Sequence, residues 1–140
     1  MSIGFKKGVA ALDIISLIKD KYGDNYRLRS PLTKEEYNQA KELLPKELLD
    51  VLKVSNGIDE IMMINGKAET IWFIIDPLSR IIDQTSFYHN EYGNDGIVFA
   101  GNGAGGFYIL KDDGKIYLFE YFDIGEELYA ESLAEYFKKM

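Results

Sequence analysis

Hydrophobic positions are densest between residues 97 and 122, where the chain reads IVFAGNGAGGFYILKDDGKIYLFEYF. Apolar side chains fill Ile97–Ala100, Phe107–Leu110 and Ile116–Phe122, and glycine-rich or acidic residues separate these runs. The Asp113-Gly114 pair between the last two runs is typical of a β-hairpin turn. Apolar residues occupy nearly every position of these runs rather than alternate ones. We therefore expect strands that are covered on both faces, or that leave one face for a partner.

Two helices have clear signals at their ends. Thr33 and Glu36 have the spacing of a capping box, which predicts a helix that runs to about Leu43. A second helix is predicted to open at Pro45 and to end at Asn56-Gly57. The residues of this second helix expected to face inward are Leu48, Leu49, Val51 and Leu52.

Helical spacing also marks three further segments. They are Ala10–Tyr22, Leu78–Tyr92, expected to be a short helix, and a terminal helix with Leu133, Tyr136 and Phe137 on its apolar side. Gly23 stands where the first of these helices should stop. Ser132 and Glu135 form a second capping box at the start of the terminal helix.

A second hairpin is predicted between Glu60 and Ile75. Asn65-Gly66, the preferred sequence for a two-residue type I′ turn, joins Glu60–Ile64 to Ala68–Ile75. The apolar sides of all these elements are expected to meet in one core that includes Leu48, Leu52, Trp72, Val98, Ile109, Leu118 and Phe137.

Two polar stretches lack a secondary-structure pattern. Asp24–Pro31 contains Arg27 and Arg29 and is expected to be a solvated loop. Asp123–Glu127 is expected to be an acidic connection between the last strand and the terminal helix.

The glycine cluster has the G-x-G-x-x-G spacing of a dinucleotide-binding loop, through Gly101, Gly103 and Gly106. That motif requires a helix directly after the loop, because the amides at the helix N-terminus hold the pyrophosphate. Here a strand-like run, Phe107–Leu110, follows and leaves no room for a helix. We expect no nucleotide cofactor, and instead a loop or bulge that needs positive φ or close backbone approach.

The composition argues against several kinds of catalytic site. The 140 residues, 46% of them hydrophobic, suit one folded domain. The absence of cysteine excludes a disulfide, a thiol nucleophile and a cysteine-based zinc site. The single His89, expected at the surface or at a helix end, cannot form a two-histidine metal centre. Carboxylates such as Glu120 and Asp123 would need a deep cleft for glycoside chemistry, so we expect no enzyme and no metal.

Charge is distributed unevenly along the chain. The net charge is −7, and residues 112–140, with eight acidic and three basic side chains, carry −5 of it. This argues against binding to nucleic acid or to an anionic membrane and permits a basic partner. Lys6 and Lys7 precede only the short run Gly8–Leu12 before Asp13 interrupts it. That run is too short for a secretory or membrane segment, and a cytoplasmic location is expected.

The order of these elements resembles the SUKH superfamily, the Smi/Knr-type domain. The resemblance rests on LPKELL at 44–49 with Ser55-Asn56-Gly57, on GIVFAGNGAGGFYILKDDGKIYLFEY at 96–121, and on the helix at 132–137. It covers residues 33–140, whereas residues 1–30 are less characteristic. It implies one α+β domain over residues 1–140, with a mostly antiparallel sheet of about five or six strands and helices packed against it. The elements that the hydrophobic pattern predicts agree with that fold.

The resemblance also implies a function in binding. Many members are immunity proteins that neutralise a cognate toxin, often a nuclease, in bacterial polymorphic toxin systems, and fungal relatives act in cell-wall and signalling regulation. The expected function is therefore toxin neutralisation by occlusion of the toxin's active site. The alternative is a regulatory scaffold domain that binds other cellular proteins without any toxin. No catalytic or cofactor-binding residue carries over.

An acidic surface rich in tyrosine is the expected contact with a toxin that has a basic cleft; the alternative is that this acidic surface only keeps the protein in solution. These residues are expected to share one end of the sheet: Tyr108, Asp112, Asp113, Tyr117, Glu120, Tyr121, Asp123, Glu126 and Glu127.

Overall fold

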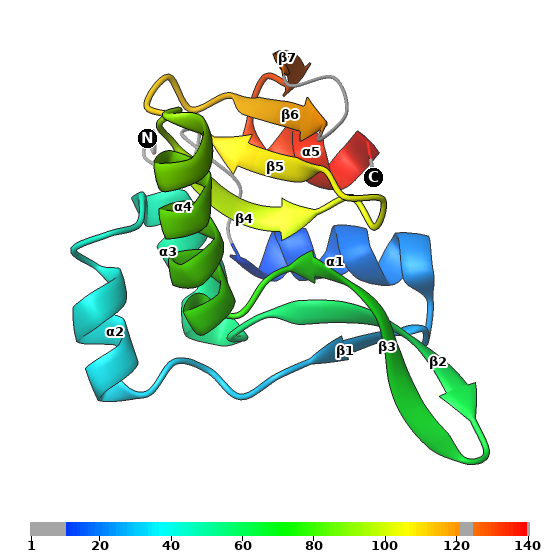
Figure 1. The fold of residues 1–140 in the computed structure, drawn as a ribbon. Coiled ribbons are helices and arrows are strands. Elements are labelled where there is room, and N and C mark those ends of the chain that lie inside the picture. Colours follow the sequence, from blue (N-terminus) through cyan, green and yellow to red (C-terminus); the bar gives the residue numbers. More distant parts are fainter. Residues whose placement is uncertain (1–10, 121–124, 140) are drawn as a thin grey trace, which may run out of the picture.

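The protein, as a computed structural model, is described at residues 11–120 and 125–139. In this part of the chain the helices are α1 (Ala11–Tyr22), α2 (Lys34–Ala40), α3 (Lys46–Val54), α4 (Leu78–Tyr92) and α5 (Leu133–Lys139) (Figure 1). The strands are β1 (Tyr26–Leu28), β2 (Ile58–Ile64), β3 (Lys67–Ile75), β4 (Ile97–Gly101), β5 (Phe107–Leu110), β6 (Ile116–Glu120) and β7 (Gly125–Ala130). The α+β class expected from the sequence is confirmed.

The strands form two antiparallel sheets rather than the expected single sheet. The first has the order β1-β2-β3 and the second the order β4-β5-β6-β7. One backbone hydrogen bond, from Asp76 N to Phe99 O at 2.8 Å, joins the end of β3 to β4. Register shifts at Ile58/Asp59 and Glu60/Ile61 disturb the β2–β3 ladder, and such bulges increase the twist of a hairpin. The β2–β3 hairpin therefore projects away from the four-stranded sheet, as Figure 1 shows.

Helices cover both faces of the second sheet, as the continuous apolar runs predicted. On the face that carries α4, the Tyr88 ring packs edge-on against Phe119, with centroids 5.1 Å apart. On the opposite face, Tyr136 of α5 packs against Phe99 at 5.0 Å. The Tyr136 hydroxyl also donates to Ile74 O at 3.0 Å, so α5 holds the first sheet as well as the second.

The sheet divides the core into two clusters. The larger contains Leu48, Leu52 and Phe137 and joins residues from α1 to α5. The smaller, between α4 and the sheet, consists of Tyr88, Val98, Ile109 and Phe119. The expectation of one meeting point was wrong because Val98 and Ile109 lie on the other side of the sheet. Trp72 and Leu118, expected in the core, are only partly buried.

Most of the predicted element ends are confirmed. Thr33 Oγ1 accepts from Glu36 N at 3.1 Å while Thr33 N donates to Glu36 Oε1 at 2.9 Å, so the capping box is complete. The helix that it opens ends at Ala40, earlier than expected. Asn65 and Gly66 have φ values of 53° and 78°, as a type I′ turn requires. His89 lies exposed in the last turn of α4.

Both polar stretches without a predicted element contain a strand. The segment expected to be a solvated loop includes β1, which pairs with β2. The segment expected to be an acidic connection enters β7 at Gly125, and Glu126 pairs with Phe119 of β6. Asp123 lies outside the described residues.

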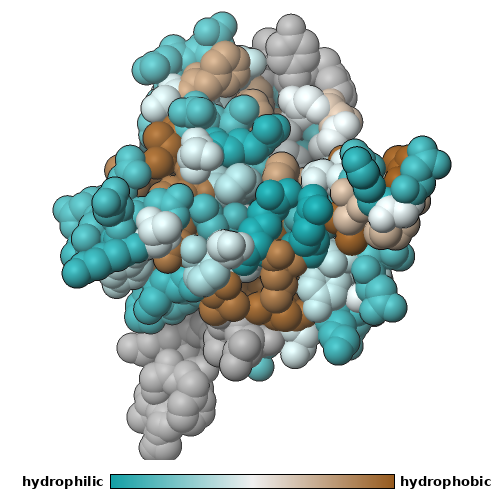
Figure 2. All heavy atoms as spheres, turned by 90° about the horizontal axis from the view of Figure 1, so that it is seen from below, coloured by the Kyte–Doolittle hydropathy of each residue, from teal (hydrophilic) through white to brown (hydrophobic). Residues whose placement is uncertain are grey.

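The β2–β3 hairpin exposes apolar side chains near its tip. The residues concerned are Met62, Met63, Ile64 and Ile71, and Ile71 is 51% exposed. Figure 2 shows apolar atoms among polar ones at this end of the molecule, on the right of the view. Within the described residues, no helix combines the length and the apolar character that crossing a bilayer requires.

Candidate functional site

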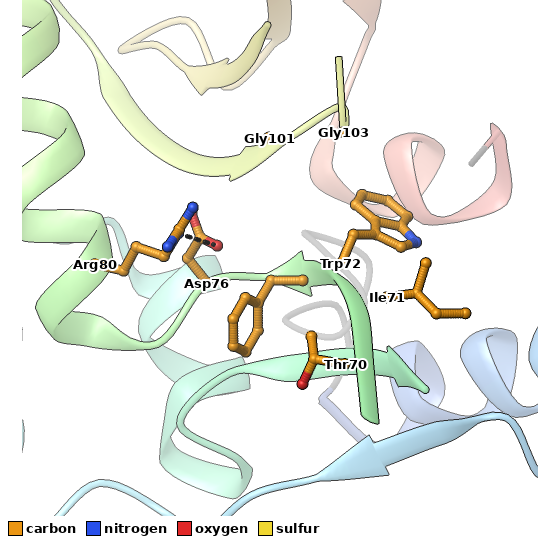
Figure 3. A pocket seen from close by; sticks show the side chains of 8 residues that line it. Thr70, Ile71, Trp72, Asp76, Arg80, Gly101 and Gly103 are labelled. Atoms are coloured by element: carbon orange, nitrogen blue, oxygen red, sulfur yellow. Dashed lines mark ion pairs between the residues drawn. The ribbon is translucent and has the colours of Figure 1, made fainter. Parts of the chain in front are cut away.

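A groove lies where the two sheets diverge, between β3 and the loop that follows β4. Its volume is about 310 Å³, and its lining residues are Thr70, Ile71, Trp72, Phe73, Asp76, Arg80, Gly101 and Gly103. A second hollow of about 190 Å³ shares Asp76, Arg80 and the two glycines. In Figure 3, Asp76 and Arg80 stand on one side of the groove and Trp72 on the other, below the backbone of Gly101 and Gly103.

The glycine loop is a tight turn held by Asn102. The Asn102 side-chain oxygen accepts from Ala104 N at 2.9 Å and from Gly106 N at 2.8 Å. Gly103 has a φ of 78°, and a Cβ on Gly106 would lie 2.9 Å from Phe119 O. This confirms the expectation of positive φ and close backbone approach. The strand β5 begins directly after Gly106, where a dinucleotide-binding loop would need a helix.

Asp76 and Arg80 form an ion pair on one side of the groove. Arg80 Nε lies 3.3 Å from Asp76 Oδ1, and the side chains are 55% and 4% exposed. Burial raises the pKa of Asp76 to about 7, and the nearby Arg80 charge only partly opposes this effect. The groove therefore holds a carboxyl that changes its charge near neutral pH.

Guanidinium groups surround Phe73 of β3. The Cζ atoms of Arg29 and Arg80 lie 4.9 and 5.9 Å from the centre of its ring, within the range of cation–π attraction. In the same strand, the residue before Phe73 is Trp72, whose Nε1 donates to Glu60 Oε1 at 2.6 Å. The groove thus combines aromatic walls with the half-exposed guanidinium of Arg80, whose charge is balanced by Asp76 when that carboxyl is ionised.

Arg27 in β1 and Arg29 just after it are not simply solvated, as expected for a loop, because both bind a fully buried carboxylate. Asp59 accepts hydrogen bonds from Arg27 at 2.9 Å, from Arg29 at 3.1 Å and from Thr70 at 2.6 Å. Burial alone would raise the pKa of Asp59, but these hydrogen bonds outweigh it and hold that pKa below its ordinary value. The signal in the sequence was the acidic Asp59 inside an apolar strand, which needed a cationic partner.

Strand order separates the acidic residues expected to share one end of the sheet. Asp112 and Asp113 lie in the turn between β5 and β6, and Asp113 accepts from the Tyr117 hydroxyl at 2.7 Å. Glu120 lies at the far end of β6, beside the glycine loop, where Asn102 Nδ2 approaches it at 3.4 Å. Glu127 pairs with Leu118 near that same end and is exposed.

Two of the other expected contact residues take part in internal packing. Glu126 accepts from the Tyr88 hydroxyl and pairs with Lys111 Nζ at 2.7 Å. The Tyr108 ring packs against Tyr129 and Tyr136, with centroids 4.8 and 5.0 Å away. The remaining two, Tyr121 and Asp123, lie outside the described residues.

The described residues contain no group of three or more histidine or acidic side chains that could hold a metal ion.

The comparison with curated proteins gave no match. A family model, the SMI1/KNR4 family (SUKH-1), matches residues 31–139. This range covers the groove, the glycine loop and every described strand except β1. The chain therefore belongs to the SMI1/KNR4 family (SUKH-1), in the SUKH superfamily.

Proposed function

We propose that this chain is an immunity protein that binds a cognate bacterial toxin, a nuclease with a basic cleft, and occludes its active site. The observation that carries the proposal is the family match over residues 31–139, because the SUKH resemblance implies binding proteins of this kind. The net charge of −7 supports it, since a nuclease must itself be basic where it holds phosphate.

The proposed contact surface is the end of the molecule that carries the glycine loop and the β2–β3 hairpin. Glu120 and Glu127, near the loop, would attract a basic cleft over a distance and raise the association rate. Met63 and Ile71 on the hairpin, with Trp72 beside them, offer apolar area that the toxin would bury. Asp112 and Asp113 belong to the opposite end and are less suited to the same contact.

Co-expression tests the proposal directly. The probe is the toxin domain encoded by the open reading frame next to this gene, and the readout is survival of the host cells. We expect survival with the parent protein and loss of protection when Glu120→Lys and Glu127→Lys are combined.

The matched control combines Glu35→Lys and Glu42→Lys, which change charge by the same amount at exposed positions on and just after α2. Survival should be unaffected in this control. If the parent protein neither protects cells nor co-purifies with the toxin domain, the immunity function is wrong. The regulatory scaffold would then be the better account of the family match.

A further inference from the structure

Within residues 11–120 and 125–139, no strand pairs with the outer edge of β3. β3 is the last strand of its sheet and, with nine residues, the longest strand of the described chain. Past Phe73, Ile74 O accepts from Tyr136 and Asp76 N donates to Phe99, so this part of the edge is closed. Among the described residues, the main chain of 67–73 makes no backbone hydrogen bond beyond its ladder with β2. Such an edge offers unpaired N–H and C=O groups to another strand.

The opposite wall of the groove leaves room for that strand because it has no side chains. Gly103 needs its positive φ of 78° for the turn. Gly101 has no such requirement: its φ is not in the positive region, and a Cβ there would meet only Gly106 O, at an ordinary 3.5 Å. Neither backbone conformation nor packing demands glycine at position 101. A side chain at this position would instead narrow the groove.

We propose that the groove receives an extended segment of the partner, which adds as a fourth strand along the open edge of β3 and places an acidic side chain beside Arg80. This inference rests on the proposed function, since the partner is the toxin. Strand addition supplies affinity through main-chain hydrogen bonds, and the pockets beside the edge supply specificity.

Local charge selects the acidic side chain. Arg80 meets Asp76 through Nε, and within the described residues its terminal Nη nitrogens donate no hydrogen bond. Arg29, on the other contact of the Phe73 ring, is already paired with Asp59, so Arg80 is the guanidinium that would meet the added carboxylate. A carboxylate on the added strand would therefore find two free guanidinium donors on Arg80, and charge-assisted bonds of this kind are the stronger ones.

The test uses Gly101→Val and the purified toxin domain from the neighbouring open reading frame. Valine suits an extended backbone and fills the groove, so affinity should fall at least tenfold while the melting temperature stays within a few degrees. Ala104→Val, at the exposed tip of the same loop and outside the groove lining, is the matched control and should bind like the parent. Arg80→Met should weaken binding less than Gly101→Val, because it removes the carboxylate contact and the ion pair with Asp76 but leaves the groove open to the added strand.

Hydrogen exchange keeps the test decisive even if Gly101→Val fails to fold. In the complex of the parent protein, amides within 68–73 should exchange more slowly than in the free protein. The toxin domain could bind without any change in the exchange rates of these amides and with the same affinity for Gly101→Val as for the parent. Strand addition would then be wrong, but the proposed function would still hold. If the toxin domain does not bind the parent protein at all, both proposals fail. Protection that grows with concentration in the free protein would assign the edge to a second copy and also overturn the inference.

Discussion

Asp59 and Asp76 are buried carboxyls near the same hairpin, and their surroundings shift their pKa values in opposite directions. Asp59 has three hydrogen-bond donors, Arg27, Arg29 and Thr70, which keep it ionised. Asp76 has a single ion pair with Arg80, and burial dominates. The number of donors within reach therefore decides which buried carboxyl keeps its charge.

Asp76 should make the protein less stable as the pH rises from about 4 to about 7. Its pKa is about 7 in the folded chain against an ordinary value of 3.8, so the folded state binds more protons across this window. Replacement of Asp76 by Asn removes the titration. The free energy of unfolding of Asp76→Asn, relative to the parent, should therefore rise by up to about 4 kcal/mol between pH 4 and pH 8. Urea denaturation at both pH values measures this; parallel pH profiles for the two proteins would refute the assignment.

The Asp59 cluster predicts a rescue by a second change. Arg27→Met with Arg29→Met leaves a buried carboxylate whose one remaining side-chain partner in the described part of the chain is Thr70, and should cost about 3 kcal/mol of unfolding free energy. The addition of Asp59→Asn removes the buried charge and should recover part of that loss. Chemical denaturation of the double and triple variants measures which of the two has the larger free energy of unfolding. A triple variant less stable than the double would show that the carboxylate is not the source of the cost.

At the scale of single elements, capping and turn residues predicted the helices and the β2–β3 hairpin, whereas the short strand β1 and the strand β7 were not predicted. The Thr33–Glu36 capping box and Asn65-Gly66 depend on neighbouring residues alone, so the sequence contains all that they need. By contrast, β1 has three residues and exists because Arg27 pairs opposite Asp59, 32 positions away. In β7 two acidic residues follow Gly125, and Glu126 is tolerated there because it forms an ion pair with Lys111 and a hydrogen bond with the Tyr88 hydroxyl. Long-range partners of this kind cannot be found by periodicity.

Helix α3 should depend on its buried face. Leu52 is fully buried in the larger core cluster, so Leu52→Ala should reduce the free energy of unfolding by about 2–5 kcal/mol. Leu43→Ala, at a leucine that is 48% exposed, is the control and should cost less than about 0.5 kcal/mol. Thermal or urea unfolding measures both. A loss below about 0.5 kcal/mol for Leu52→Ala would mean that α3 packs through another face.

At the scale of the whole molecule, the sequence predicted the α+β class but not the division into two sheets. The division arises at Asp76-Pro77, where one hydrogen bond connects β3 to β4, and at the two bulges of the β2–β3 ladder. The groove is a product of this divergence. Its residues come from β3, α4 and the glycine loop, which are far apart in the sequence, so no local motif could predict the groove. In the sequence, the spacing of Gly101, Gly103 and Gly106 is instead typical of a dinucleotide-binding loop.

Association with a basic toxin should be sensitive to salt. The Debye length shortens from about 14 to about 6 Å between about 50 and 300 mM salt, so electrostatic attraction to the acidic chain weakens. We expect a clearly slower association rate at the higher salt concentration and little change in dissociation. Stopped-flow mixing with the toxin domain measures both rates. The combination of Glu120→Lys and Glu127→Lys should slow association at low salt, and an unchanged rate would remove these residues from the contact.

Titration of the purified toxin domain with this protein, followed by the toxin's own catalytic activity, tests the central claim most directly. The account predicts that activity falls linearly and vanishes near one molecule of protein per toxin, with a Kd in the nanomolar range. If the toxin domain stays fully active when saturated, or does not bind, the chain does not neutralise it by occlusion.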